Sequence, residues 1–264
     1  MAGFYTQSNK DNKGHLEMSD IYKAPEAQLT EGGESGSYGS LEKGLAGDYS
    51  IAIEDTLKEA WNRSKGKKLT IWLALILYFV CYVAITLVAS VITGYSAFNF
   101  GASANGALTS MFLYQVIVAL ATAPLIAGLW MVGVKIAREE QTSATEIFSH
   151  FDKLLPLAIA NILISIFTLV GFFLFVIPGI YLSVAYLLAI PLIADKNMGP
   201  WQAMETSRKA ITKHWFSFFG FLIVCLLLYF AGALALLIGL IWALPLIAIA
   251  IGVVYRNIFG GPED

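Results

Sequence analysis

The pattern of apolar and charged positions divides the chain into a polar segment, residues 1–49, and a series of long apolar runs. Residues 69–93 and 108–134 are uncharged over 25 and 27 positions, so each can cross a hydrocarbon core of about 30 Å as one helix. Residues 154–194 and 216–255 are uncharged over 41 and 40 positions. Each would be about 60 Å long as a single helix, roughly two membrane thicknesses, and is expected to fold back as a hairpin. The pattern predicts six spans, near 69–93, 108–134, 154–177, 180–194, 216–235 and 238–255.

The turn of the first long run is expected at Pro178 and Gly179. Proline cannot continue the helical hydrogen-bond ladder, and glycine adopts the left-handed geometry of a turn. Only residues 180–194 remain for the fourth span, about 22 Å of helix. Three alternatives stay open: the span recruits residues 175–177, the bilayer thins locally, or the segment is a re-entrant half-helix. Pro191 is expected to kink the inner end of this helix.

The positions of the basic residues test the number of spans. All twelve lysines and arginines after residue 60 precede the first span, lie between spans two and three or four and five, or follow span six. The segment 94–107 and the two hairpin turns carry no charge. Six crossings therefore place every one of these bases on the same side, which the positive-inside rule makes cytoplasmic. Both termini are predicted to be cytoplasmic.

Short amphipathic helices are expected before each hairpin, near Ser50, Ser143 and Pro200. In the first, Ile53 and Leu57 share a face opposite Glu54, Asp55, Lys58 and Glu59. In the second, Ser143 and Glu146 have the spacing of a capping box. Such helices lie in the membrane interface, and the tryptophans Trp61, Trp201 and Trp215 are the expected interfacial anchors. Three units of one amphipathic helix and one hairpin suggest a repeated design.

Basic side chains of the third amphipathic segment are candidate contacts for lipid or another anion: Arg208, Lys209 and Lys213. Arg208 falls within the apolar face of the predicted helix. Its side chain is expected either to snorkel to lipid phosphate or to pair with a loop carboxylate such as Asp195. A specific contact with an anionic head group or substrate is the functional alternative.

Composition supports a membrane protein with an acidic tail. The chain is 57% hydrophobic and 14% charged, against about 25% charged residues in soluble domains. Residues 1–60 hold 11 acids and 5 bases, whereas residues 61–264 hold 8 acids and 12 bases. Residues 1–49 contain too few apolar side chains to offset the entropy of ordering, so they are predicted to form a disordered cytoplasmic tail. Its one apolar island, residues 21–29, is a candidate docking segment.

No catalytic, cofactor-binding or metal-binding constellation is expected from the sequence. The cysteines Cys81 and Cys225 lie singly in apolar runs and are interpreted as buried hydrophobes. His150 has only Glu146 at helical spacing, and two ligands do not make a metal site. The predicted spans contain no ionisable side chain of the kind that marks proton or ion paths. Their notable polar groups are the candidate contacts Gln115, Asn161 and Ser183, which are expected to form interhelical hydrogen bonds.

The motifs "IPGIYL" and "GPWQAMETSRKAITKHW" carry a family resemblance. The region 51–256 resembles bacterial six-span inner-membrane proteins of unknown function, which are related to the membrane domain of some glycerophosphodiester phosphodiesterases. The resemblance implies a six-helix fold and a bacterial inner-membrane location. It implies no catalytic or ligand residue, because this chain has no phosphodiesterase domain attached.

The leading functional hypothesis is a non-enzymatic membrane protein that acts as an accessory or organising subunit of a larger membrane assembly. The expected partners are the lipid bilayer and another membrane protein or further copies of this chain, and no nucleic acid is expected. An uncoupled carrier or channel for a lipid-like or small amphipathic solute is the alternative, and it predicts a cavity lined by the polar groups of the spans. A sensor of lipid packing built on the amphipathic helices is the third hypothesis.

Overall fold

The computed structural model describes residues 38–95, 104–235 and 237–261, and this part of the chain contains helices and loops but no strand. Six helical segments within it are long and apolar enough to cross a membrane: Lys68–Thr93, Leu108–Ala137, Ala144–Leu174, Val176–Lys196, Trp215–Leu234 and Leu240–Phe259. The predicted fold class, an all-α polytopic membrane protein with six transmembrane helices, is confirmed.

The first unit consists of an amphipathic helix and two long apolar helices. Helix α2 spans Ile53–Ser64, α3 spans Lys68–Thr93 and α4 spans Ala104–Ala137. Gly66, at a φ of 78°, makes the sharp turn between α2 and α3 because glycine carries no Cβ that would clash in this conformation. Helix α3 ends where Gly94 adopts the left-handed conformation.

The second unit begins with short 3₁₀ turns rather than a regular amphipathic helix. The turns η1 and η2 span Ala144–Phe148 and Phe151–Lys153, and α5 follows at Leu154–Leu174. The predicted capping box is wrong: the Ser143 hydroxyl makes no cap bond to the backbone and instead lies 2.8 Å from the Thr145 hydroxyl. The carboxylate of Glu146 turns inward, where its Oε2 lies 2.8 Å from Lys135 Nζ.

The hairpin turn of this unit lies at Phe175 and not at the predicted Pro178 and Gly179. Phe175 is extended, with φ of −160° and ψ of 152°, and α6 starts directly after it at Val176–Ala185. Pro178 therefore occupies the first turn of α6, where its missing N–H has no helical partner to lose. Gly179 is helical, and a Cβ there would collide with the Phe172 ring, so this glycine allows α5 and α6 to touch.

The fourth span is broken into two helices. Helix α6 ends at Ala185, and α7 spans Ala189–Lys196. Pro191 has no N–H for the carbonyl of Leu187, so a continuous helix cannot pass this point without losing a bond. The break at Tyr186–Leu188 therefore replaces the predicted kink at the inner end. The two helices together span Val176–Lys196, so the fourth span does include residues 176 and 177.

The third unit is α8 at Pro200–Lys213, α9 at Trp215–Leu234 and α10 at Leu240–Phe259. Pro200 is the first residue of α8, as predicted. Gly232 and Gly239 bring the distal ends of α9 and α10 together, because a Cβ on Gly239 would lie 2.7 Å from the Gly232 Cα. The C-terminal half of α10 is almost fully buried, and the helix as a whole contacts α1, α2, α4 and α9.

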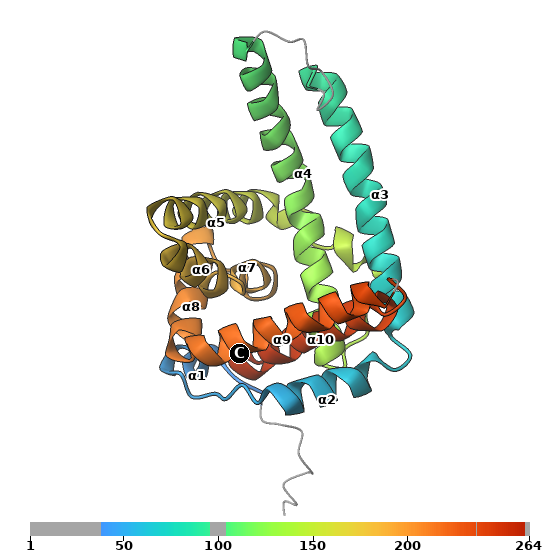
Figure 1. Ribbon diagram of the computed structural model, residues 1–264, viewed down its shortest axis with the longest axis vertical. Coiled ribbons are helices and arrows are strands. Elements are labelled where there is room, and N and C mark those ends of the chain that lie inside the picture. The colour runs from blue at the N-terminus through green and yellow to red at the C-terminus, as the bar shows by residue number, and fades with distance from the viewer. Residues whose placement is uncertain (1–37, 96–103, 236, 262–264) are drawn as a thin grey trace, which may run out of the picture. The chain divides into compact units, whose positions relative to one another are not determined.

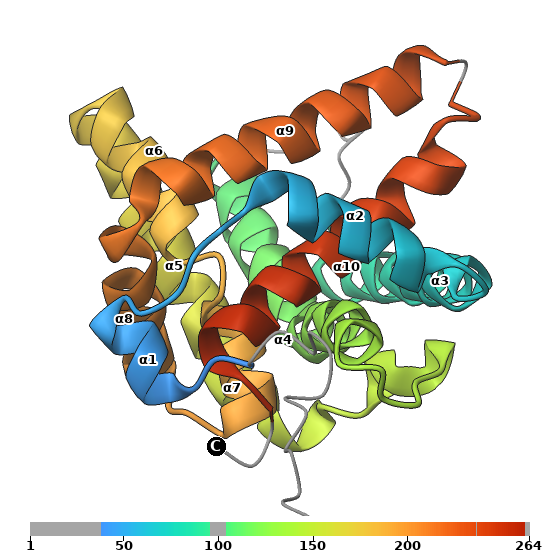
Figure 2. The same ribbon diagram turned by 90° about the horizontal axis from the view of Figure 1, so that it is seen from below.

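The three hairpins point in different directions from a common region, which we call the base. The base is formed by α2, α7, α8 and the adjoining ends of α4 and α10. In Figure 1 the pair α3 and α4 rises away from the base, whereas α5, α9 and α10 run crosswise to it. Figure 2 shows the same relationship from below, with α3 and α4 seen nearly end-on and the tips of the other two hairpins well apart. Buried side chains therefore gather where α2, α4, α7, α8 and α10 meet.

The folded region starts earlier than predicted. Residues 38–49 were assigned to the tail, but α1 spans Leu41–Ala46 and contacts α8 and α10. The Ser40 hydroxyl accepts a bond from Lys43 N–H and caps this helix, and Tyr49 donates its hydroxyl proton to the Ala210 carbonyl at 2.8 Å. These contacts order residues 38–49 against α8 and α10, which their polar composition did not indicate. The candidate docking segment 21–29 lies outside the described residues.

Candidate functional site

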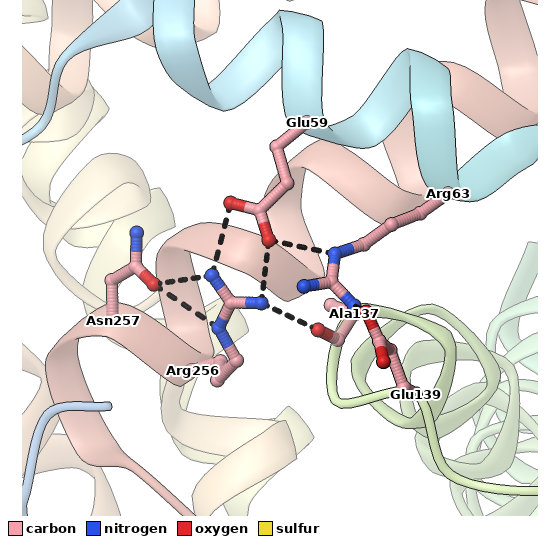
Figure 3. Close-up of polar contacts among 6 residues, drawn as sticks. All are labelled: Glu59, Arg63, Ala137, Glu139, Arg256 and Asn257. Carbon is pink, nitrogen blue, oxygen red and sulfur yellow. Dashed lines mark hydrogen bonds and ion pairs between the residues drawn. The ribbon is translucent and has the colours of Figure 1, made fainter. Parts of the chain in front are cut away.

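The end of α10 presents two consecutive buried polar side chains, Tyr255 and Arg256, at the centre of the base. Arg256 is only 2% exposed. Its guanidinium donates from Nη1 and Nη2 to both carboxylate oxygens of Glu59 on α2, at 2.7 and 3.0 Å. Nη1 also donates to the Ala137 carbonyl at the end of α4, at 2.6 Å. Figure 3 shows this guanidinium between the two elements. One side chain thus joins α2, α4 and α10.

A second arginine extends this contact toward the loop after α4. Arg63 lies one helical turn after Glu59 and donates from Nε to the same carboxylate at 2.6 Å. Its Nη1 reaches Glu139 Oε1, also at 2.6 Å, as Figure 3 shows. Glu139 has a φ of 62°, a left-handed backbone conformation that residues other than glycine seldom adopt.

Arg138, Asp195 and Tyr255 form the other half of the site. Arg138 follows α4 and donates from Nη1 and Nη2 to the two oxygens of Asp195 near the end of α7, both at 2.7 Å. Tyr255 donates its hydroxyl proton to the same carboxylate at 2.8 Å. The side chains of Arg138 and Asp195 are only 2% and 3% exposed. We call Glu59, Arg63, Glu139, Arg256, Arg138, Asp195 and Tyr255 together the basal ion network.

Charge pairing outweighs the effect of burial at two groups of the network, Glu59 and Arg138. Burial of Glu59 favours its neutral form, but hydrogen bonds from Arg256 and Arg63 prevail and lower the pKa of this carboxyl. Burial likewise opposes the charge of Arg138, whereas the hydrogen bonds and charge of Asp195 raise its pKa. Both groups are therefore charged at neutral pH.

This arrangement favours a structural role over chemistry. Each guanidinium in the basal ion network faces a carboxylate, so none is left to bind a substrate anion. Within the described residues, no group of three or more His, Cys, Asp or Glu side chains could hold a metal ion. The network instead connects the ends of α2, α4, α7 and α10, which belong to all three units. Buried pairs of this kind are sensitive to the loss of either partner.

His150 and Glu146 form a separate polar contact on the second unit. Their side chains are each about 10% exposed and lie 3.5 Å apart, from Nε2 to Oε1. Glu146 is buried because η1 packs against α4. Gly128 makes this packing close, since a Cβ there would lie 2.6 Å from the Glu146 carbonyl oxygen.

The predicted anion contacts on α8 do not converge on one site. Arg208 pairs with Glu205 on its own helix, from Nη2 to Oε2 at 2.9 Å, and not with Asp195, which is already bound by Arg138. The Glu205 hydrogen bond raises the pKa of Arg208. The ammonium of Lys209 is 3.8 Å from Glu205, and its side chain is 60% exposed. Lys213 is exposed at the end of α8.

The buried face of α8 instead supports the break in the fourth span. Ser207 is fully buried and donates from its hydroxyl to the Ala185 carbonyl at 2.7 Å. The hydroxyl oxygen of Ser207 also accepts a bond from the Leu188 N–H at 3.2 Å. One serine therefore satisfies a donor and an acceptor that the interruption between α6 and α7 leaves open. Irregular backbone at membrane depth is tolerated only where protein provides such partners.

The three polar groups predicted within the spans stay separate. Gln115 is exposed on α4 and Ser183 is exposed on α6, where its hydroxyl donates to the Ile180 carbonyl at 2.8 Å. Asn161 is half-buried on α5, and its backbone carbonyl accepts a bond from the Ser165 hydroxyl. None of them lines either of the two described cavities, one between α3, α4 and α10 and one between α6 and α9.

The three predicted tryptophan anchors occupy two kinds of environment. Trp61 and Trp201 are 45% and 59% exposed on α2 and α8. Trp215 is half-buried and stacks on Phe219 with ring centroids 5.0 Å apart. The exposed pair has the exposure that interfacial anchoring requires, whereas Trp215 also packs within the protein.

Sequence reasoning missed most of the basal ion network. Asp195 had been named only as a partner for Arg208, Glu59 had been assigned to a solvated face, and Arg138, Arg256 and Tyr255 had no role. The available signal was the position of Arg256 and Asp195 at the ends of apolar runs, since charged side chains in such places are rarely buried without a partner. Nothing in one sequence indicates which partner it is.

No protein-family model, curated protein or solved structure matches this chain. The resemblance to bacterial six-span proteins therefore stays a prediction, and the functional proposal depends on the fold and on the contacts described above.

Proposed function

We propose that this protein is a non-enzymatic, multi-pass membrane protein that organises or supports a larger membrane assembly through the surfaces of its three hairpins. The single observation that carries this proposal is the divergence of the hairpins from a closed polar base. Their distal parts expose large apolar side chains in every unit, including Val91 at 83%, Phe173 at 90% and Leu234 at 85%. Such surface needs lipid or protein to cover it.

The basal ion network supports a scaffold with a fixed inner part. It ties the three units together at their charged ends, whereas close glycine contacts hold the turns of the second and third hairpins, Gly171 with Gly179 and Gly232 with Gly239. Helices of another membrane protein, or of a second copy of this chain, can therefore pack between hairpins without breaking the base. Small residues at exposed helix surfaces would favour such packing.

The charge distribution supports a cytoplasmic base with both termini inside, and the family resemblance of residues 51–256 supports a bacterial inner-membrane location. Basic residues from separate loops meet there: Lys153 donates to the Ala194 carbonyl, Lys196 to the Gly261 carbonyl and Arg138 to Asp195. Their common side is the one that the positive-inside rule assigns to the cytoplasm. Impermeant maleimide should label Thr93→Cys, at the end of α3 away from the base, in intact cells, in a background without the native cysteines. It should label Lys209→Cys only after permeabilisation, and the reverse pattern would contradict this orientation.

Photocrosslinking in native membranes tests the organising role. A photoreactive amino acid at Val91, Phe173 or Leu234 should produce a discrete adduct with another protein or with a second copy of the chain. The matched control is the fully buried Phe218, which should give no intermolecular adduct. Lipid adducts alone from all three exposed positions would contradict the proposal. They would instead describe a protein that works alone in the bilayer.

A further inference from the structure

Lys68, the first residue of α3, lies between two indole rings at one corner of the base. Its ammonium is 5.2 Å from the centroid of Trp61 on α2 and 5.6 Å from that of Trp242 on α10. Both distances are within the range of cation–π attraction. This attraction uses the faces of the rings and leaves the N–H donors of the ammonium available for an anion.

Two further lysines, Lys65 and Lys67, precede Lys68 and are exposed. Lys65 donates to the Asn62 side chain at 3.1 Å. Across the described residues, none of these three ammonium groups has a carboxylate within ion-pair distance, unlike the arginines of the basal ion network. The corner therefore carries local positive charge that no carboxylate of the described residues neutralises.

An apolar cavity begins one helical turn beyond this corner. Its volume is about 220 Å³, and it lies between α3, α4 and α10. No ionisable side chain lines it; the lining residues are Ile71, Leu75, Leu129, Trp130, Val132, Gly133, Leu244, Ile247, Ala248 and Ile251. Pockets for drug-sized ligands measure about 300–1,000 Å³. This cavity therefore fits part of one hydrocarbon chain and not a whole lipid.

The charged corner and the cavity are adjacent on two helices. Ile71 follows Lys68 by three positions, which places both on one side of α3. On α10, Trp242 stacks over Lys68 and Leu244 lines the cavity two residues later. Trp72 donates from its indole to the Ile241 carbonyl at 3.2 Å and fixes α3 against α10 at this point. The arrangement is thus formed before any ligand binds.

We propose that this corner is a binding site for one phospholipid with an anionic head group. The phosphate binds the ammonium of Lys68 with support from Lys65 and Lys67, and one acyl chain enters the cavity between α3, α4 and α10. Basic pockets beside membrane-spanning helices bind anionic head groups in this way. A soluble phosphate would leave the cavity unused, and an uncharged lipid would leave the lysines unused. This inference is independent of the proposal that other proteins bind the hairpins.

Native mass spectrometry of the full chain in detergent, titrated with phosphatidylglycerol or phosphatidylcholine, tests the site. One phosphatidylglycerol should bind about fivefold more tightly than phosphatidylcholine, and Lys68→Gln should abolish this preference. Lys58→Gln is the matched control, because it removes the same charge from neighbouring α2, where Lys58 pairs with Glu54 at 2.6 Å. Leu129→Phe should narrow the cavity and weaken phosphatidylglycerol binding while the head-group lysines stay in place.

Inorganic phosphate is used as a competitor to distinguish a lipid site from a phosphate site. Phosphate should fail to displace the bound phosphatidylglycerol, since the acyl chain contributes to binding. Displacement by phosphate, equal binding of the two lipids, or equal effects of Lys68→Gln and Lys58→Gln would each overturn the proposal. Lys68 lies at the protein surface beside Trp61, so its variant decides the question even if Leu129→Phe does not fold.

Discussion

Glu59 and Arg256 are separated by 197 positions in the chain and are joined by two parallel hydrogen bonds of 2.7 and 3.0 Å. The first residue lies on the amphipathic helix before span one, and the second lies in the last turn of span six. This pair fixes the start of the membrane region to its end, with the Ala137 carbonyl at the end of α4 as a third partner.

Replacing one partner of this pair should destabilise the protein more than replacing both. Arg256→Met leaves Glu59 with Arg63 alone, and Glu59→Leu leaves a buried guanidinium without its carboxylate. Each single change is expected to cost about 3–5 kcal/mol, whereas the double variant should recover part of this loss. Thermal unfolding in detergent, followed by circular dichroism, measures the difference. Lys58→Gln is the control with an expected effect below about 1 kcal/mol, and a strictly additive double variant would contradict the expectation.

The pKa of Glu59 predicts how the stability of the protein depends on pH. This pKa is lower in the folded protein than in the unfolded chain, so the unfolded chain binds more protons as the pH falls through the range of carboxyl titration. The stabilisation by Glu59 is present above the unfolded pKa and is lost as pH falls through the folded pKa. The difference in melting temperature between wild type and Glu59→Gln should therefore shrink between about pH 6 and pH 3. A constant difference would show that Glu59 has the same pKa in the folded and unfolded protein.

Ser207→Ala should destabilise the interrupted fourth span. The Ala185 carbonyl and the Leu188 N–H would both lose their partner, and an unsatisfied buried backbone group costs about 1–3 kcal/mol. Hydrogen exchange of residues 185–188 should rise along with the loss of thermal stability. Ser183→Ala, on the exposed side of α6, removes only a bond within its own helix and should leave both measurements nearly unchanged.

Gly252→Ala should disrupt the crossing of α4 and α10. A Cβ at this position would collide with the Gly133 carbonyl and lie 2.9 Å from the Val134 nitrogen, both of them backbone atoms that cannot rotate away. Gly220→Ala is the control, because a Cβ there meets only the Ile53 Cδ1 at 3.8 Å. The control should be neutral or stabilising by up to about 1 kcal/mol, measured by thermal unfolding. Equal melting temperatures for the two variants would contradict this close crossing.

The fold class could be read from the sequence, whereas the network at the base could not. Runs without charge set the number of spans, and helices α3, α9 and α10 begin and end within a few residues of the prediction. Glu59 was misassigned because hydrophobic periodicity treats any charged face as solvated, and the contact with Arg256 depends on how distant helices pack. The break before Pro191 was displaced by several residues because the loss of its hydrogen bond acts on the preceding turn. Residues 38–49 were assigned to the tail because their partners, α8 and α10, are far away in sequence.

The dependence of the fourth span on Ser207 has a consequence for the order of synthesis. Residues 185–188 leave the ribosome before residue 207, so the interrupted backbone emerges before its only side-chain partner exists. Until α8 follows, the Ala185 carbonyl and the Leu188 N–H have no protein partner, and lipid cannot provide one. Span four therefore reaches its final position only when α8 has been made, and the second and third units must complete their insertion together.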